Sequence, residues 1–205
     1  MNDLIQQIAI LAPPFLLAIT FHEVCHGYVA YRLGDPTARD QGRLTLNPLK
    51  HLDLLGVIAF IIIKIGWAKP VPVNPAYFRD PDKGMLYVSL AGPGSNFVLA
   101  VASSIAARLF LPVAGLLPQA VASPLLQMLA ASVWINIVLG IFNLVPIPPL
   151  DGSKIVMGLL PRELADAYRK LEPFGFVLLL LLFYTGIIGR VIRPLIDLAY
   201  SLIGV

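Results

Sequence analysis

Two histidines and a glutamate lie close together in the first apolar stretch of the chain, where His22, Glu23 and His26 form the pattern H-E-x-x-H. In a helix, residues four positions apart lie on nearly the same face, so both imidazoles can bind one metal ion. Glu23 lies one position further round, where its carboxylate can take a proton from a metal-bound water without being a ligand. This is the arrangement of a zinc hydrolase.

The pattern H-E-x-x-H also arises by chance, but its surroundings argue against chance here. The segment from Phe15 to Tyr31 is otherwise almost entirely apolar. Polar side chains at membrane depth are costly, and for that reason they are usually functional. Cys25 occupies one of the two variable positions and points away from the expected metal face, so we interpret it as a small packing residue.

The composition of the 205-residue chain is that of an integral membrane protein. Hydrophobic residues make up 58% of it and charged residues 13%, and the mean hydropathy is +0.80. These values are too apolar for a soluble domain of this length. The sequence has no basic face interleaved with aromatic residues, so we expect no nucleic-acid partner. A single cysteine excludes an internal disulfide bond.

Long apolar stretches predict an all-α polytopic membrane protein with three core transmembrane helices, at about residues 3–31, 84–111 and 125–145. Residues 173–205 predict one or two further helices, interrupted by glycine, arginine and proline. We therefore divide the chain into a core, residues 1–172, and a C-terminal transmembrane helical segment. That segment would complete the bundle or form a subunit contact, with a mobile gate for substrate as the alternative.

Basic residues set the expected orientation in the membrane, because cytoplasmic loops are rich in lysine and arginine. The residues just after the first and third spans are the basic ones: Arg32, Arg39, Arg43 and Lys50, and Lys154, Arg162, Arg169 and Lys170. Both spans are therefore expected to end on the cytoplasmic side. This agreement requires that residues 54–65 do not cross the membrane.

The stretch at residues 54–73 is too short for a regular span. Its apolar part, up to Lys64, falls below the roughly 20 residues that a spanning helix needs. It is rich in β-branched residues, and its Val-Pro-Val tail cannot be helical. We predict a re-entrant, β-like hairpin beside the active site, with an open strand edge that could receive an extended peptide. A short, distorted span is the alternative.

Two histidines do not complete a catalytic zinc site, which typically has three protein ligands and a water. Asp151 is the best third ligand, because it follows the proline-rich break after the third span, at the same predicted depth as His22 and His26. Its alternative role is to cap a helix at residues 152–160. The remaining histidine, His51, is more simply explained as a residue that stabilises the connector after the first span.

Two asparagines in the predicted spans are candidates for a supporting role. Asn96 lies in the second span and Asn143 lies just before the proline-rich break. Either side chain could donate a hydrogen bond to the oxyanion that forms at a scissile carbonyl or otherwise support the substrate. Asn96 could equally be a polar contact between helices.

Taken together, these motifs resemble the site-2 protease family of intramembrane zinc metalloproteases. Three motifs carry the resemblance in order: His22-Glu-Val-Cys-His26, Ala91-Gly-Pro-Gly-Ser-Asn96 and Asn143-Leu-Val-Pro-Ile-Pro-Pro-Leu-Asp151-Gly152. The segments Gly42-Arg-Leu-Thr-Leu-Asn-Pro48 and Gly66-Trp-Ala-Lys-Pro-Val-Pro-Val-Asn74 are similar to the short prokaryotic branch of that family.

The resemblance implies that His22, His26 and Asp151 hold one Zn²⁺ per chain. It also implies that Glu23 is the general base and acid of an endopeptidase that cuts peptide bonds within or next to transmembrane segments, as in regulated intramembrane proteolysis. The expected partners are a transmembrane protein substrate and the lipid bilayer. The expected location is the cell membrane, with the active site near its cytoplasmic side. The sequence leaves homo-oligomerisation open.

Two readings from other function classes remain. A metal-binding membrane transporter would use the same four polar residues as a transit site, but it predicts further polar residues along the spans, and few are present. A catalytically inactive, substrate-binding relative is disfavoured because Glu23 and all three proposed ligands are present.

Overall fold

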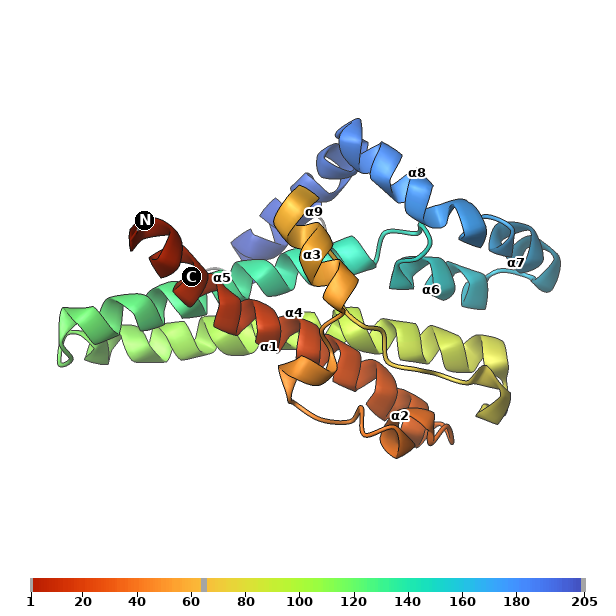
Figure 1. Ribbon diagram of the computed structural model, residues 1–205, viewed down its shortest axis with the longest axis horizontal. Coiled ribbons are helices and arrows are strands. Elements are labelled where there is room, and N and C mark those ends of the chain that lie inside the picture. Colours follow the sequence, from red (N-terminus) through yellow and green to blue (C-terminus); the bar gives the residue numbers. More distant parts are fainter. Residues whose placement is uncertain (1, 64–65, 204–205) are drawn as a thin grey trace.

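The computed structural model describes residues 2–63 and 66–203, and helices dominate it (Figure 1). Among these residues, three helices are long and apolar enough to cross a membrane: α1 (Asn2–Arg32), α4 (Pro81–Ala114) and α5 (Gln119–Asn143). They confirm the predicted all-helical fold with several candidate membrane spans, although α4 and α5 both begin earlier than expected.

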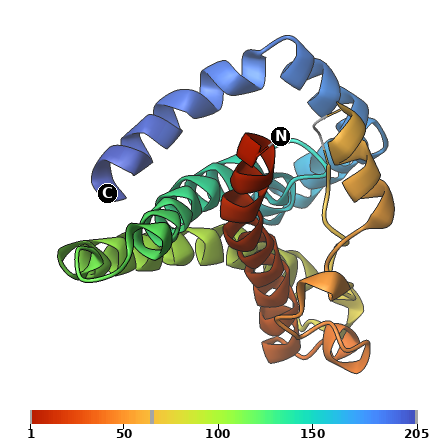
Figure 2. The ribbon, with the colours of Figure 1, turned by 60° about the vertical axis from the view of Figure 1, so that its left-hand side comes forward.

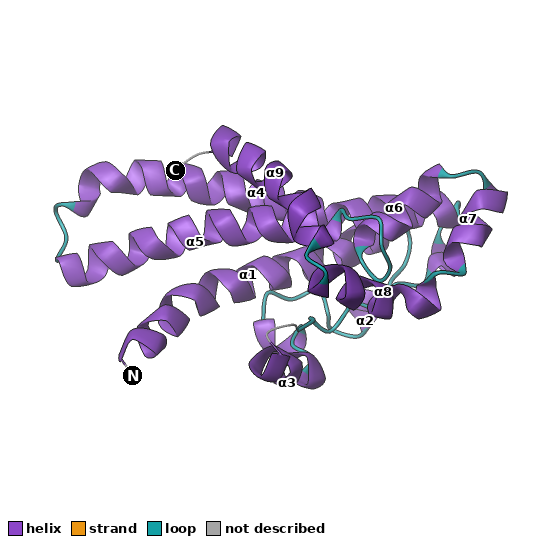
Figure 3. Cartoon of the chain, turned by 90° about the horizontal axis from the view of Figure 1, so that it is seen from above, coloured by secondary structure: helices purple, strands orange, loops and turns teal. Residues whose placement is uncertain are grey.

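Helices α4 and α5 form a long antiparallel pair, and α1 packs against both of them (Figure 3). The start of α4 is set by Asp80, whose side chain accepts a hydrogen bond from the Lys83 N–H, and by Pro81 in the first turn. Along the pair, Ala100 of α4 packs with Val133, Ile137 and Ile141 of α5 in an apolar core. This packing holds α4 and α5 in fixed positions next to α1.

The C-terminal region forms two helices, α8 (Glu172–Tyr184) and α9 (Ile187–Ile203), which are bent by 76° relative to each other. Gly186, at the bend, has a φ of +72°, a conformation that favours glycine. The two helices arch over the rest of the molecule (Figure 2). Helix α9 packs on the α4–α5 core through Ile192 and Ile196, so this part of the segment completes the bundle.

Shorter elements connect these helices. Helix α2 (Thr37–Asp40) and two 3-10 turns, Pro48–Lys50 and Pro75–Tyr77, lie in the connectors between α1 and α4. Helices α6 (Asp151–Leu159) and α7 (Arg162–Arg169) follow the proline-rich break after α5.

The prediction of a β-like hairpin at residues 54–73 is wrong. Its apolar part is helix α3 (Leu54–Ile63), and no strand occurs in the described residues; residues 64 and 65 lie outside them. Residues 66–74 form no regular element, and their prolines favour an extended backbone. A helix satisfies its own backbone polar groups, whereas an isolated hairpin leaves edge groups unpaired, and this outweighs the β-branched composition. One isolated antiparallel bridge, between Leu52 and Ala68, is the only pairing seen in this part of the described chain.

Helix α3 is also too short to serve as the alternative, a distorted span. Its 10 residues correspond to about 15 Å at 1.5 Å per residue, half of the roughly 30 Å hydrocarbon thickness. The ends of α1 and α5 can therefore lie on the same side of a membrane, as the distribution of basic residues requires.

Candidate metal centre

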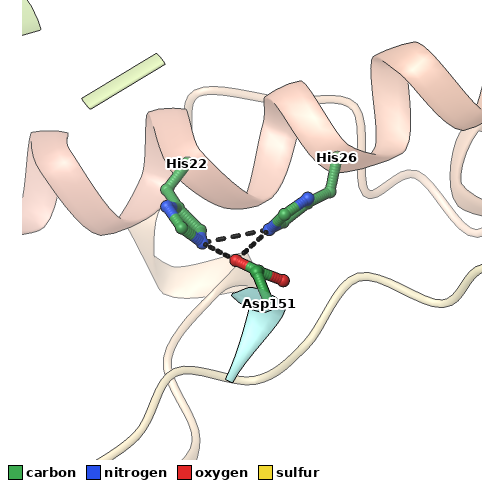
Figure 4. A group of neighbouring side chains, drawn as sticks. All are labelled: His22, His26 and Asp151. Atoms are coloured by element: carbon green, nitrogen blue, oxygen red, sulfur yellow. Dashed lines mark hydrogen bonds and ion pairs between the residues drawn. The ribbon is translucent and has the colours of Figure 1, made fainter. Parts of the chain in front are cut away.

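Helix α1 presents His22 and His26 one turn apart, and α6 begins at Asp151 directly opposite them (Figure 4). The Nε2 atoms of His22 and His26 lie 3.1 Å and 3.2 Å from Oδ2 of Asp151, and 3.0 Å from each other. The three residues are 7%, 8% and 8% exposed. The structure thus brings together the three side chains that the sequence predicts as ligands. Leu150, not Asp151, holds the N-cap position of α6.

The other ring nitrogen of each histidine faces an acceptor. Nδ1 of His26 lies 2.6 Å from the Val88 carbonyl oxygen, which can only accept, so Nδ1 carries the hydrogen. Nδ1 of His22 lies 2.6 Å from Oδ1 of Asn96 in the same way. In the neutral imidazoles, each Nε2 atom then carries no hydrogen, and its lone pair points at the carboxylate of Asp151.

The chemistry of this donor set fits a zinc ion. Oδ2 of Asp151 is buried with no hydrogen-bond donor, so the converging acceptors need a positive charge between them. A tetrahedral ion with bonds of about 2.0–2.1 Å separates its ligands by about 3.3 Å, close to the observed spacing.

Two glycines permit the close approach of the elements around this cluster. A Cβ atom on Gly92 of α4 would lie 2.6 Å from Cε1 of His22 and closer still to His26. A Cβ atom on Gly152 would meet the Leu144 carbonyl carbon at 2.5 Å. Only a residue without a side chain lets α4 lie against the histidines and lets α6 fold back onto the end of α5.

Glu23 lies beside the cluster and is held by a single hydrogen bond. Its Oε2 accepts from the backbone N–H of Val71 at 2.8 Å, and the residue is half-buried. Val71 belongs to the extended residues 66–74, which we call the 66–74 segment. Because Oε2 is engaged by that backbone group, Oε1 is the carboxylate oxygen left for proton transfer.

The 66–74 segment is fastened to the rest of the chain at several further points. The Lys69 N–H donates to the His51 carbonyl at 2.8 Å, and the Lys69 carbonyl accepts from the Arg43 guanidinium at 2.8 Å. The Asn74 N–H donates to Oδ2 of Asp35 at 2.7 Å. His51 is fully buried, and its Nε2–H donates to the Thr45 carbonyl, so its side chain stabilises the connector and lies outside the metal cluster.

These contacts also determine what the segment can offer to a peptide. The N–H groups of Lys69 and Val71 are already donated within the chain, and Pro70 and Pro72 have none. Between residues 69 and 72, no backbone N–H is therefore left for an incoming strand. The expectation of an open strand edge fails for this part of the segment.

A cavity of about 1300 Å³ lies in front of the metal cluster. The three proposed ligands and Glu23 line it, and most of its wall is apolar. Asn143 also lines it, with its Nδ2 donating to the Leu139 carbonyl at 3.0 Å. Trp67 of the 66–74 segment and Phe176 of α8 meet edge to face across one wall, with 5.9 Å between ring centroids. Asn96, in contrast, is fully buried beside His22.

Comparison with known proteins places this site in a family. Residues 109–182, from the second half of α4 into α8, match the model of peptidase family M50. Over 182 residues the chain is 40% identical to YwhC of Bacillus subtilis (strain 168), provisionally named a zinc metalloprotease, and the match covers 89% of this chain and 83% of YwhC. The chain belongs to peptidase family M50. As an M50 zinc metalloprotease it is a hydrolase, and its resemblance to site-2 proteases is confirmed.

Two further relatives match less closely. Rip2 of Mycolicibacterium smegmatis, also provisionally named a zinc metalloprotease, is 31% identical over 182 residues, or 86% of this chain and 67% of Rip2. MJ0392 of Methanocaldococcus jannaschii, named a zinc metalloprotease, is 25% identical over 158 residues, or 76% of this chain and 35% of its own length. No solved structure gives a significant match.

Sequence reasoning missed several residues that shape this M50 site. The Val88 carbonyl and the Val71 N–H are backbone groups, and the residue type at a position does not indicate which hydrogen bonds its backbone makes. Asn136, which donates to and accepts from buried partners behind His22, did carry a signal. It is the one amide side chain between Met128 and Phe142 of the apolar helix α5, and such a residue is costly unless it is used.

Proposed function

We propose that this M50 peptidase is an endopeptidase that hydrolyses peptide bonds within or next to transmembrane segments of membrane proteins. One zinc ion held by His22, His26 and Asp151 would serve each chain. The observation that carries the proposal is the buried His-His-Asp cluster, whose two histidines lie on α1, a helix long and apolar enough to cross a membrane. Ligands in such a helix suit a substrate that itself lies in the membrane.

The cavity supports a transmembrane substrate. Its wall is built largely from apolar side chains, among them Phe15, Ile19, Phe142, Phe176 and Leu180. Such a wall can accept the apolar side chains of a membrane segment without desolvating polar groups. The substrate helix must first unwind locally, because its own hydrogen bonds hide the scissile carbonyl.

Residues of this chain would divide the chemical work. Zinc, when bound, supplies a Lewis acid that lowers the pKa of water towards about 7 and polarises a carbonyl. Glu23 would accept the proton of the attacking water on Oε1 and later donate it to the leaving amine. The hydrogen bond from Val71 to Oε2 holds the carboxylate in one orientation for both transfers.

The two asparagines would have different roles. Asn143 lines the cavity, so its amide could turn from the Leu139 carbonyl and donate to the oxyanion or to the substrate backbone. Asn96 contacts Nδ1 of His22 and is fully buried, so it would support the metal ligand.

The proposed partners are a transmembrane protein substrate and the lipid bilayer, with the active site near the cytoplasmic side. The basic residues that follow α1 and α5 support this orientation. The outward faces of the candidate spans carry large apolar side chains suited to lipid, for example Ile8 at 57%, Val98 at 65% and Leu109 at 73% exposed.

The test is to purify the protein in detergent, measure its zinc content, and assay cleavage of a helical membrane substrate and of a soluble peptide of the same sequence around the cut. We expect about one zinc per chain and preference for the membrane substrate. Glu23→Gln should retain zinc and lose about 10²- to 10⁴-fold in rate. Glu163→Gln, at an exposed position of α7, is the matched control and should behave as the wild type.

Three results would contradict separate parts of the proposal. Undiminished cleavage by zinc-bound Glu23→Gln would show that Glu23 is not the general base. Wild-type protein that binds no metal would refute the zinc centre. Equal cleavage of the soluble peptide would refute the restriction to membrane segments.

A further inference from the structure

A chain of buried polar side chains runs from His22 into the interface between α4 and α5. Asn96 accepts from His22 Nδ1 through its Oδ1, and its Nδ2 donates to Oδ1 of Asn136 at 2.9 Å. The Nδ2 of Asn136 donates to the Ser132 carbonyl at 2.9 Å. Beyond it, the hydroxyls of Ser132 and Ser103 are 2.8 Å apart.

Helix packing alone does not explain the two amides of this chain. Asn96 is 0% and Asn136 is 1% exposed, and both lie between helices that could cross a membrane. Burying an amide is unfavourable unless its hydrogen bonds are made, and a small apolar residue would pack there without that requirement. Their presence indicates a need for hydrogen bonds of a fixed direction.

Between Ser132 and His22, the direction of each bond in the chain follows from backbone carbonyls, which can only accept. The Ser132 carbonyl requires the NH₂ group of Asn136, so the Oδ1 of Asn136 faces Asn96. That oxygen, together with the Ala18 carbonyl at 3.4 Å, requires the NH₂ group of Asn96. The Oδ1 of Asn96 must then face His22 and accept from Nδ1–H.

The two histidines differ in this respect. His26 donates to a backbone carbonyl, whose polarity cannot reverse. His22 faces an amide, which can present either oxygen or nitrogen after a rotation of its terminal group. If the amide of Asn96 were reversed, it would donate to Nδ1, and the hydrogen of a neutral His22 would move to Nε2. His22 could then no longer bind a metal through Nε2.

We propose that Asn136 is a positioning residue for His22: by fixing the direction of the Asn96 amide, it keeps Nε2 of His22 free to bind the metal ion. The inference rests on the proposed function in that it takes His22 to be a zinc ligand. Asn136 itself touches neither the metal cluster nor the cavity, and acts through Asn96.

The experiment compares Asn136→Leu, Asn96→Leu and the double variant, each as full-length protein in detergent. The zinc dissociation constant is measured by competition with a chelator, and the visible spectrum of the Co²⁺-loaded protein reports the geometry of the ligands. Loss of a residue that orients a metal ligand typically weakens metal binding by about 10- to 100-fold, and we expect Asn136→Leu to fall in this range. The double variant should bind zinc no more weakly than Asn96→Leu, because Asn136 acts through Asn96.

Two further variants guard against an effect of folding. The serine side chain of Asn136→Ser is too short to reach Asn96. Its hydroxyl can donate to a backbone carbonyl of its own helix, so no polar group is left without a hydrogen bond in the membrane. It should weaken zinc binding as Asn136→Leu does. Ser103→Ala removes a hydroxyl at the far end of the chain, where the Ser132 carbonyl still orients Asn136, and should leave zinc affinity unchanged.

Wild-type zinc affinity in both Asn136 variants would overturn the inference. Losses that multiply in the double variant would also overturn it, because Asn136 would then act independently of Asn96. Since zinc affinity is measured without substrate, failure of the proposed function can be distinguished from failure of this inference. Zinc-bound wild type that cuts no membrane substrate would refute the protease proposal alone, whereas the zinc measurements would still decide the role of Asn136.

Discussion

The two walls of the cavity hold their functional groups in different ways. On the wall built by α1, α4 and α5, both histidines are fixed through buried hydrogen bonds inside helix interfaces. The other wall is built by the 66–74 segment, and its Val71 N–H donates the hydrogen bond that holds Glu23, which itself belongs to α1. The neighbouring helix α3 is loosely covered, with Leu54 75% and Leu55 67% exposed. The metal cluster therefore depends on helix packing, whereas the orientation of the Glu23 carboxylate depends on a loop. Mutations should separate the two effects.

The largest effect is expected where α6 brings the third ligand to the histidine wall. Asp151→Asn removes the carboxylate that balances the charge of the ion. We expect zinc affinity to fall by more than about 100-fold, beyond the usual effect of residues that only orient ligands. Zinc titration of the purified protein measures this. Asp166→Asn, at an exposed ion pair of α7, is the control and should bind zinc normally; normal binding by Asp151→Asn would exclude it as a ligand.

A methyl group on α4 should disturb the histidine wall without removing a ligand. Gly92→Ala places a Cβ against both imidazoles, and overpacking of this kind costs about 1–3 kcal/mol of stability. We expect weaker zinc binding and a lower melting temperature. Gly94→Ala is a matched control on the same helix, since its Cβ would meet nothing within 4 Å. If the two variants behave alike, the close contact between α4 and the histidines is not needed.

On the other wall, Val71→Pro removes the N–H that binds Glu23 while keeping the extended backbone. A hydrogen bond to a charged group contributes about 1.5–3 kcal/mol, so we expect kcat to fall by roughly tenfold or more. Zinc content should not change. Val73→Pro adds the same stiffness two residues later and is the control. A parallel loss of zinc in Val71→Pro would show that the two walls are not independent.

The smallest effect on catalysis is expected at Asp35, which ties the 66–74 segment to the end of α1. Burial would raise the pKa of its carboxyl, but hydrogen bonds from the Thr37 hydroxyl and from the Asn74 and Thr37 N–H groups lower it below the ordinary value of 3.8. The lowered pKa stabilises the fold above that pH, and the stabilisation is lost as the pH falls below it.

Asp35→Asn has one acceptor oxygen where the carboxylate has two, so a buried N–H or hydroxyl loses its partner. We expect a loss of about 1–3 kcal/mol in the free energy of unfolding at neutral pH, which shrinks as the pH falls below about 4. Zinc affinity per folded molecule should stay the same. Unfolding curves at several pH values check this against Asp40→Asn, an exposed carboxylate of α2. A deficit that does not vary with pH would contradict the role of the charge.

Much of the histidine wall could be predicted from residue types. The spacing of His22 and His26, the proline-rich break before Asp151 and the length of the apolar stretches each carry a physical reason that is visible in the chain. Asn136 could have been included by the same reasoning about polar groups in apolar helices.

The wall built by α3 and the 66–74 segment could not be predicted in the same way. The choice between helix and hairpin for residues 54–63 depends on the surroundings of the backbone, which the β-branched side chains do not reveal. The bond from Val71 to Glu23 joins a backbone group to a residue 48 positions away. Such a contact follows from the path of the chain in three dimensions, and any residue other than proline could have made it.

The prolines of the 66–74 segment have a consequence for the association of one chain with another. Exposed extended segments tend to recruit strands from neighbouring molecules, and in a membrane two copies diffuse in a plane and meet often. Pro70 and Pro72 have no backbone N–H to donate to such a neighbour, and the N–H groups of Lys69 and Val71 already donate within the chain. The segment can therefore stay extended beside Glu23 without becoming a template for aggregation.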